Sequence, residues 1–361
     1  MKKQAPHPDL PVRFDRLREM TDDFGLFQHG RLSKPDPDHG YCVDDNARGL
    51  VVCAEYYDLA GDENILDLVE IYLRFLEKAQ CRDGRFHNFA DIEQQWLDDV
   101  GSEDCQGRAI FAAAAGSVSN LPEAMRKRSR KLFDAARHLV DSFRYLRSHA
   151  EYLLAAARLA EKKALSRRGG IDESAGRFVS SWKQYSRPGW RWFEPMMTYA
   201  NARLPHALIA AYQVRQQPRW LEIALESLEF LIEQTVRDNI YVPIGNAGWH
   251  ALGRDRISEF DQQPIETDTM VALLVDVVCL LNTETGLESL APRNVRQYAE
   301  LARMCHEWFL GRNRVGQAVA QPDVGGCYDG ITPRGPNENQ GAESILAFLS
   351  SSLACHNLPI R

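Results

Sequence analysis

Two kinds of helical segment alternate along the chain, and this alternation constrains the fold more than any other feature. Segments of the first kind are small, apolar and rich in alanine, with polar residues only at the start. Six of them occur, at residues 45–59, 105–115, 149–159, 201–214, 266–281 and 340–353. A helix that is apolar nearly all round must be buried on nearly all sides.

Segments of the second kind are amphipathic, with their charges on one stripe. They cover residues 10–20, 64–80, 123–143, 171–185, 220–237 and 295–310. Buried helices that alternate with amphipathic ones predict six helical hairpins in a ring, with the apolar helices inside. The spacing is uneven, whereas a solenoid would repeat every 20–50 residues or so. We therefore expect an all-α protein, a single (α/α)6 toroid domain over residues 1–361.

The loops that lead into the inner helices are long, and they hold most of the glycine, proline and tryptophan. They cover residues 27–41, 83–101, 186–195, 240–264 and 315–339. Long loops in a compact domain are uncommon and are usually functional. Because each one precedes an inner helix, all should lie at the same end of the ring, and we expect the functional site there.

Composition excludes several classes of partner. The net charge is −7 and no basic run is long enough to follow a phosphate backbone, so nucleic acid is not expected. The most apolar run, residues 270–281, contains Asp276 and is too short to span a bilayer, and the N-terminus lacks a signal-peptide pattern.

Eight scattered cysteines without a CxxC pair are typical of reduced thiols, so we expect a cytoplasmic location. Nucleotide-binding loops and HExxH are absent, so neither a metal nor an organic cofactor is expected.

Acidic residues gather where the inner helices begin or just before them. Asp, Asn and Ser also cap helix N-termini, so any single acid there is explained by capping. Capping does not explain Glu343 inside an apolar helix, or Glu266 just after Pro264. Two acids that face each other across a cleft can cleave a glycosidic bond. The candidate catalytic carboxylates are Asp45, Asp104, Glu194, Glu266 and Glu343.

Neighbouring residues suggest roles for these acids. Glu343 and Glu194 have hydrophobic neighbours that would favour the protonated form, so the general acid is expected to be one of them. Asp45 and Asp104 each lie close to an arginine in the sequence, so either should stay ionised and serve as base or hydroxyl acceptor.

Polar and aromatic residues of the same loops and helix starts are candidates for binding a sugar. Trp and Tyr offer a flat apolar face and a polar handle, which suits a sugar ring. The aromatic candidates are Trp96, Trp190, Trp192, Tyr199, Trp249 and Tyr328, and the polar ones are Asp44, Asn46, Arg48, Gln106, Arg108, Asn201, Arg203, Gln263 and Gln340. His39 and His87 could assist proton transfer, although anchoring a loop explains each of them as well.

The twelve alternating helices resemble the six-hairpin glycosidase superfamily over essentially the whole chain. More narrowly, His39-Gly40-Tyr41-Cys42-Val43-Asp44-Asp45-Asn46-Ala47-Arg48 and Asn339-Gln340-Gly341-Ala342-Glu343-Ser344 resemble segments of bacterial proteins from glycosyltransferase and mannoside-metabolism contexts. The superfamily resemblance implies inverting hydrolysis through paired acids. That superfamily also includes epimerases, and a fold does not fix a function.

The leading hypothesis is a glycoside hydrolase that acts on an oligosaccharide by a two-carboxylate mechanism. The first alternative is a sugar epimerase or isomerase, whose histidine bases would be His149 and His206 on inner helices. The second is a protein that binds a glycan without catalysis. The sequence does not address the oligomeric state.

Overall fold

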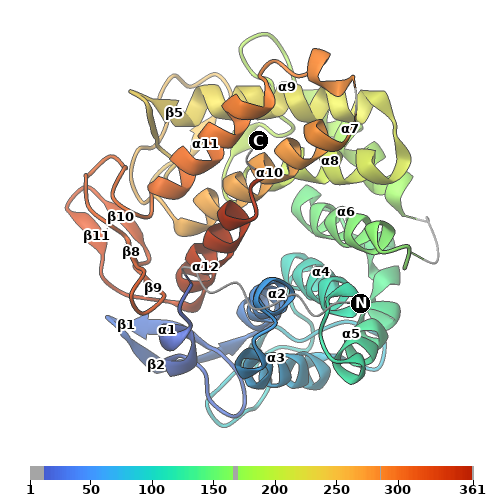
Figure 1. Cartoon of the computed structure of the whole chain (residues 1–361), viewed down its shortest axis with the longest axis vertical. Helices are drawn as coiled ribbons and strands as arrows, with labels where there is room; N and C mark the ends of the chain where they lie inside the picture. The colour runs from blue at the N-terminus through green and yellow to red at the C-terminus, as the bar shows by residue number, and fades with distance from the viewer. Residues whose placement is uncertain (1–11, 166–169, 285, 360–361) are drawn as a thin grey trace.

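The computed structural model describes residues 12–165, 170–284 and 286–359. Within these ranges, six long helices form the inner wall of a ring (Figure 1). Each packs against its two inner neighbours, and α12 closes the ring by contacting α2. The inner helices are α2 (Val43–Ala60), α4 (Glu103–Val118), α6 (Leu146–Glu161), α8 (Arg203–Arg215), α10 (Pro264–Thr283) and α12 (Ala342–His356). The predicted (α/α)6 toroid is confirmed.

An outer layer of helices covers this wall. Each outer helix packs against an inner one, and the short α1 takes its place beside α12. The outer helices are α1 (Asp15–Glu19), α3 (Leu66–Ala79), α5 (Glu123–Ala136), α7 (Ile171–Tyr185), α9 (Pro218–Thr235) and α11 (Val295–Glu307). In the part of the chain that the structure describes, three 3₁₀ turns, Glu63–Ile65, Arg137–Ser142 and Leu287–Ser289, complete the helical part.

Side-chain size explains which helices lie inside. Residues 112–115 of α4 are all alanine and almost completely inaccessible, so neighbouring backbones can approach closely. Local signals fix the helix starts: the Ser102 hydroxyl accepts a hydrogen bond from the Cys105 N–H, and proline opens α9 and α10. None of the helices in the described part of the chain is long and apolar enough to cross a bilayer.

Two outer segments differ from the sequence-based expectation. The helix expected over residues 123–143 ends at Ala136, because the chain tightens there into the 3₁₀ turn Arg137–Ser142. The helix expected over 10–20 is the short α1, and residues 10 and 11 lie outside the described ranges.

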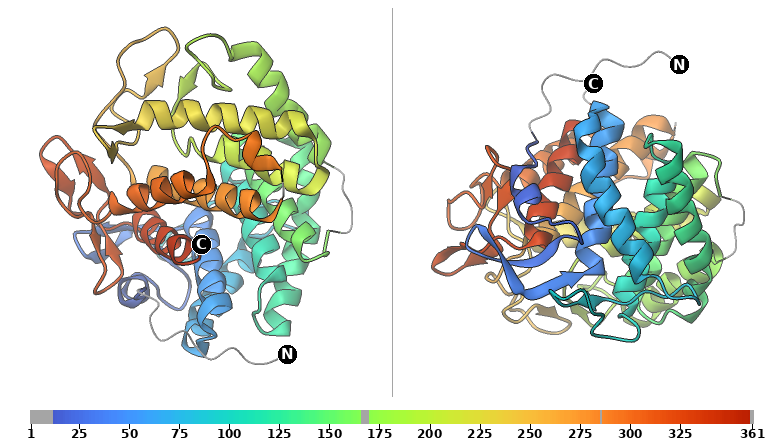
Figure 2. Two further views of the ribbon diagram at one scale, coloured as in Figure 1. Left: turned by 45° about the horizontal axis from the view of Figure 1, so that its top comes forward. Right: turned by 90° about the horizontal axis from the view of Figure 1, so that it is seen from below.

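Every strand lies in a loop that runs from an outer helix to the next inner helix. β1 (Phe27–Arg31), β2 (Lys34–Cys42) and β3 (Phe89–Ala90) form an antiparallel sheet; the two-stranded pairs are β4 (Met196–Met197) with β7 (His250–Ala251), β5 (Val236–Arg237) with β6 (Ile240–Tyr241), β8 (Ala320–Gln321) with β9 (Gly326–Cys327), and β10 (Gly330–Thr332) with β11 (Gly335–Asn337). The long loops and their strands thus gather at one end of the ring, opposite the C-terminal end of α12 (Figure 2). We call this end the loop end.

Gly40 holds the β2 strand against β3 just before α2 begins. Its φ is 59°, and a Cβ there would lie 2.1 Å from the carbonyl oxygen of Ala90. Gly61, the C-cap of α2, has a φ of 63° but open space around it. We expect Gly40→Ala to lower the free energy of unfolding by about 2–4 kcal/mol, and Gly61→Ala by about 1 kcal/mol, because only the first adds a clash to the backbone cost. Urea unfolding of both variants tests this, and equal losses would contradict the clash.

Candidate active site

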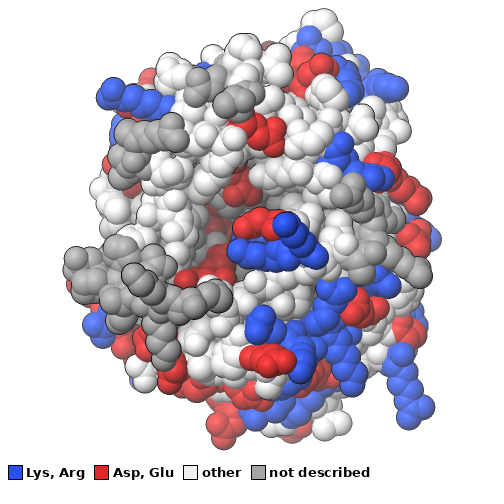
Figure 3. Space-filling view, turned by 45° about the vertical axis from the view of Figure 1, so that its right-hand side comes forward, with Lys and Arg blue, Asp and Glu red and all other residues white. Residues whose placement is uncertain are grey.

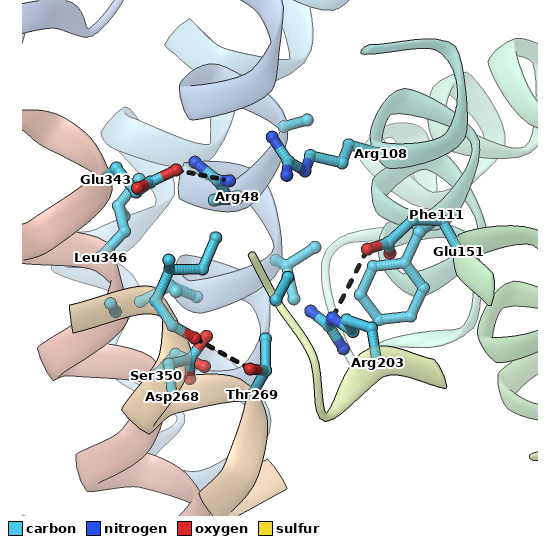
Figure 4. A pocket seen from close by; sticks show the side chains of 16 residues that line it. Arg48, Arg108, Phe111, Glu151, Arg203, Asp268, Thr269, Glu343, Leu346 and Ser350 are labelled. Atoms are coloured by element: carbon cyan, nitrogen blue, oxygen red, sulfur yellow. Dashed lines mark hydrogen bonds and ion pairs between the residues drawn. The ribbon is translucent and has the colours of Figure 1, made fainter. Parts of the chain in front are cut away.

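A narrow cavity lies on the axis of the ring, between the N-terminal parts of the inner helices (Figure 4). All six inner helices contribute to it. Its lining residues are Ala47, Arg48, Val51, Val52, Arg108, Phe111, Glu151, Ala200, Arg203, Ile265, Asp268, Thr269, Glu343, Leu346, Ala347 and Ser350. The cavity volume is about 50 Å³, which suits a few water molecules or one small substituent of a larger ligand.

Arg48 joins two of the predicted carboxylates. Its guanidinium lies 3.1 Å from Asp45 Oδ1 and 2.8 Å from Glu343 Oε2. The Asp45 side chain is 5% exposed and also accepts a hydrogen bond from the Cys42 thiol, whereas the Glu343 side chain is 41% exposed. Arg48 therefore pairs both with a buried acid, Asp45, and with an acid that is open to the cavity, Glu343.

The protonation of Asp45 differs from the sequence-based expectation. We expected the neighbouring arginine to keep this acid ionised. Burial instead raises the pKa of Asp45 to about 6, and Arg48 and the Cys42 hydrogen bond offset only part of this shift. The expected burial of Glu343 among apolar neighbours is also wrong, because its carboxylate lies beside Arg48 at the cavity.

A second group of charged side chains lies on α4 and the first turn of α2. Arg108 pairs with Asp44, and Asp104, one turn earlier on α4, accepts hydrogen bonds from the hydroxyls of Tyr199 and Ser148. Burial would lower the pKa of Arg108, but nearby carboxylates, Asp44 foremost, outweigh it and raise that pKa. The structure thus brings Asp44, Asp104 and Glu343 around the same two arginines.

The floor of the cavity contains two acids that the sequence analysis did not select. Glu151 lies 3.4 Å from Arg203 and is 7% exposed, while burial raises the pKa of Asp268 to about 6. The guanidinium groups of Arg158 and Arg203 each lie 5.8 Å from the Phe111 ring centroid. A lone acid inside an apolar helix, the pattern noted for Glu343, could have identified both Glu151 and Asp268.

Of the five predicted carboxylates, Glu343 alone lines the cavity, and Asp45, Asp104, Glu194 and Glu266 are not among its lining residues. Both oxygens of Glu194 accept hydrogen bonds from Arg147, at 2.9 and 3.2 Å. Glu266 is 5% exposed and accepts hydrogen bonds from the backbone N–H groups of Ala200 and Asn201 and from the Asn201 amide. Burial raises the pKa of Glu266 to about 7 despite these bonds. Glu266 therefore holds the backbone of Ala200 and Asn201 in place just before α8.

Four amide side chains predicted to bind sugar hydroxyls are buried, and each hydrogen-bonds within the protein. Asn46 bonds the Leu26 N–H and the Cys42 carbonyl, and Gln106 bonds both backbone groups of Phe86. Asn201 bonds Glu266, and Gln340 donates to Gln321. These amides position the loops.

The predicted aromatic and remaining polar residues divide between packing and the loop-end surface. Trp190 and Trp192 are buried, and Trp96 stacks on His87 with ring centroids 5.0 Å apart. Tyr199 and Trp249 are 36% and 38% exposed. The Tyr328 hydroxyl accepts a bond from Gln321, and Gln263 is the N-cap residue of α10. Arg203 lines the cavity floor.

The histidines proposed as epimerase bases face elsewhere. His149 is buried and lies 3.0 Å from the Ser174 hydroxyl on the outer helix α7. His206 pairs with Asp276 below the cavity floor. The β1–β2 hairpin instead supplies His29, whose ring centroid is 4.6 Å from that of His39 and whose imidazole is electrostatically coupled to Glu343.

Comparisons with known proteins agree with this architecture. No protein-family model matches the chain, and no curated protein matches it. A sugar epimerase from a ruminal bacterium has a TM-score of 0.69 and 12% identity, over 95% of this chain and 96% of that one. For cellobiose 2-epimerase from Bacillus thermoamylovorans the TM-score is 0.68 and the identity 9%, over 95% and 96%.

An α-1,6-mannanase of a Salegentibacter species is similar as well, with a TM-score of 0.64 and 10% identity over 97% and 98% of the two chains. That structure is an inactive variant in which asparagine replaces two consecutive aspartates, in complex with α-1,6-mannotriose. The shared feature is the fold, an (α/α)6 toroid, and these similar structures include both epimerases and a mannanase.

Proposed function

We propose that the chain is a glycoside hydrolase that cleaves an oligosaccharide at the loop end, with Glu343 and Asp104 as its pair of catalytic carboxylates. The observation that supports this proposal is the pair of carboxylates on the two helices that flank α2, Glu343 on α12 and Asp104 on α4. Arg48 pairs with Glu343, and the charge of Arg108 interacts with both Glu343 and Asp104. One carboxyl would protonate the leaving oxygen while the other activates a water molecule.

The remaining polar groups support this chemistry. The two arginines present guanidinium groups that can bind sugar hydroxyls or stabilise a carboxylate in its charged state. Asp45 is buried against Arg48, which suits a positioning residue. Consecutive aspartates are replaced in the inactive mannanase variant, and this chain carries the consecutive pair Asp44 and Asp45 in the first turn of α2.

The small volume of the cavity defines the binding mode that we propose. A pyranose ring would lie above the cavity, between Glu343 and Tyr199, with a single substituent pointing toward the Arg203 floor. The exposed rings of Tyr199 and Trp249 would provide apolar faces for sugar residues at the loop end.

The first test is a hydrolysis screen. Release of reducing sugar is measured over α- and β-linked manno- and gluco-oligosaccharides with the wild type, Glu343→Gln and Asp104→Asn. We expect either amide to lower kcat/KM about 10²–10⁴-fold, because each removes a proton-transfer group. Glu300→Gln, on the surface of α11 in an exposed pair with Arg296, is the matched control and should retain full activity. A wild type that hydrolyses a substrate while both amides keep near-full rates would refute the assignment.

A sugar epimerase or isomerase is the second candidate, and His29 is the observation that favours it. Burial and the neighbouring His39 lower the pKa of His29, which keeps its imidazole neutral and able to accept a proton. The test is incorporation of deuterium from D₂O into mannose, glucose or cellobiose without bond cleavage. Exchange that is lost in His29→Asn would favour this candidate over hydrolysis.

A further inference from the structure

The acidic side chains at the two ends of the ring have different kinds of partner. At the end opposite the loop end a cavity of about 1030 Å³ opens, and Figure 3 shows this face hollowed at its centre, with acidic side chains in the hollow. Glu55 and Asp276, which line that cavity, pair with Arg158 and His206. At the loop end, Asp104 instead accepts hydrogen bonds from two hydroxyl groups.

Each oxygen of Asp104 has its own hydroxyl donor. Oδ1 accepts a hydrogen bond from Ser148 at 3.3 Å, and Oδ2 accepts one from Tyr199. Ser148 lies in the first turn of α6, which is part of the inner wall. Tyr199 lies in the loop between β4 and α8, so its hydroxyl reaches Asp104 only while this loop keeps its shape. The orientation of Asp104 therefore depends on the contacts that fix Tyr199.

The backbone next to Tyr199 is strained. Ala200 has a φ of 45°, in the left-handed region that residues with a Cβ rarely adopt. Such a conformation persists only where the surrounding structure imposes it, and strained residues of this kind gather at functional sites. Glu266 holds one side of the turn, because it accepts hydrogen bonds from the N–H groups of Ala200 and Asn201.

Arg147, in the first turn of α6, holds the other side with all three guanidinium nitrogens. Nε donates to the carbonyl oxygen of Tyr199 at 2.7 Å, and Nη2 donates to the hydroxyl of Thr198 at 2.9 Å. Nη1 donates to both oxygens of Glu194. The guanidinium carbon also lies 4.5 Å from the centroid of the Tyr199 ring, within the range of a cation–π interaction. Arg147 therefore fixes both the backbone and the ring of Tyr199.

An ion pair with Glu194 does not by itself account for this arrangement. The pair uses Nη1 alone, whereas Nε and Nη2 donate to neutral acceptors beside the strained residue. The Arg147 side chain is only 11% exposed, and it is not among the lining residues of the loop-end cavity. The contacts that connect Arg147 to Asp104 thus pass through Tyr199.

We propose that Arg147 is a positioning residue, which fixes Tyr199 so that the tyrosine hydroxyl orients Asp104. The effect of Arg147 on catalysis rests on the proposed glycosidase function, in which Asp104 is one of the two catalytic carboxylates. The effect of Arg147 on the position of Tyr199 does not rest on that function, and it can be measured without turnover.

The ionisation of Tyr199 distinguishes positioning from a purely electrostatic effect. Burial and the nearby Asp104 raise the pKa of Tyr199, and the charges of Arg147 and Arg108 offset part of this shift. If Arg147 acted by its charge alone, its removal would raise that pKa further. If Arg147 positions Tyr199, its removal lets the hydroxyl leave Asp104, and the pKa of Tyr199 falls toward the ordinary tyrosine value of about 10.

The experiment is a ¹³C NMR titration of the full chain with labelled tyrosine, in which the Tyr199 signal is assigned by its loss in Tyr199→Phe. In Arg147→Gln we expect Tyr199 to titrate about one pH unit or more below the wild type. Arg147→Lys keeps the charge but has one nitrogen in place of three, so it should move the titration in the same direction by less. Arg293→Gln, which breaks an ion pair with Glu229, is the matched control and should titrate as the wild type does.

Activity gives a second readout on any substrate that the wild type hydrolyses. Tyr199→Phe keeps the ring and removes only the hydroxyl, so we expect kcat to fall about tenfold while KM stays within about threefold. Adding Arg147→Gln to Tyr199→Phe should lower kcat little further, because both changes remove the same hydrogen bond to Asp104.

The proposal is overturned if Tyr199 titrates in Arg147→Gln at the same pH as in the wild type or at a higher one. A shift of equal size in Arg293→Gln would overturn it as well. A wild type that cleaves no glycoside would refute the glycosidase proposal alone, since the NMR titration still decides whether Arg147 positions Tyr199.

Discussion

Replacing Arg48 by leucine is expected to lower kcat/KM about 10²–10³-fold on any substrate that the wild type hydrolyses. Among the residues that the structure describes, Arg48 is the one cation that contacts both Asp45 and Glu343. Without it, the open carboxylate of Glu343 loses the partner that fixes its orientation, and a misplaced catalytic group costs rate at this scale. The measurement is kcat/KM of the variant, together with a circular-dichroism spectrum to check the fold.

The pH profile separates an electrostatic role of Arg48 from a merely structural one. The charge of Arg48 opposes the burial that raises the pKa of Asp45 to about 6, so its removal should raise that pKa further and move the acid limb of the profile to higher pH. Arg48→Lys keeps the charge but offers one nitrogen where arginine offers two, and it should recover only part of the rate. Activity within threefold of the wild type in Arg48→Leu, with an unmoved profile, would contradict the role given to Arg48.

The ring of helices could be predicted from the sequence because segments that are apolar on nearly all sides alternate with amphipathic ones. An alanine-rich segment such as 105–115 has no polar face to present to water, so its position inside follows from composition and periodicity alone. The gathering of the long loops at one end of the ring could be predicted as well, since each long loop precedes an inner helix. The 3₁₀ turn after Ala136 depends on tertiary packing, and nothing in the local pattern marks it.

The site was predictable only in part, because sequence does not show which way a polar side chain points. Asn46 and Gln106 stand near the starts of inner helices, as Arg48 and Arg108 do, yet the amides turn back to bond the loops around Leu26 and Phe86. A buried amide can satisfy a backbone N–H and carbonyl together, whereas a guanidinium has only donors and seeks carboxylates. In this ring the amides hold the loops, and the arginines line the cavity.

The second large effect is expected for the stability of Glu266→Ala. The carboxylate of Glu266 accepts hydrogen bonds from three donors that are otherwise buried: the N–H groups of Ala200 and Asn201 and the Asn201 amide. Alanine would leave all three without an acceptor, so we expect the free energy of unfolding to fall by about 3–5 kcal/mol. Urea unfolding at constant pH measures this loss. Glu194→Ala, which removes a more exposed acid paired with one arginine, should cost clearly less.

Because Glu266 titrates, the free energy of unfolding should also depend on pH in a way that identifies this residue. Its folded-state pKa of about 7 lies above the ordinary glutamate value of 4.5, so the native state holds the proton more tightly than the unfolded chain does. The stabilisation is therefore fully present below about pH 4.5 and is lost as the pH rises toward 7, by about 3 kcal/mol in total. The stability difference between the wild type and Glu266→Gln, whose side chain cannot titrate, should shrink by that amount over the same range. A difference that stays constant between pH 4.5 and 7 would mean that the three hydrogen bonds, rather than burial, control the ionisation of Glu266.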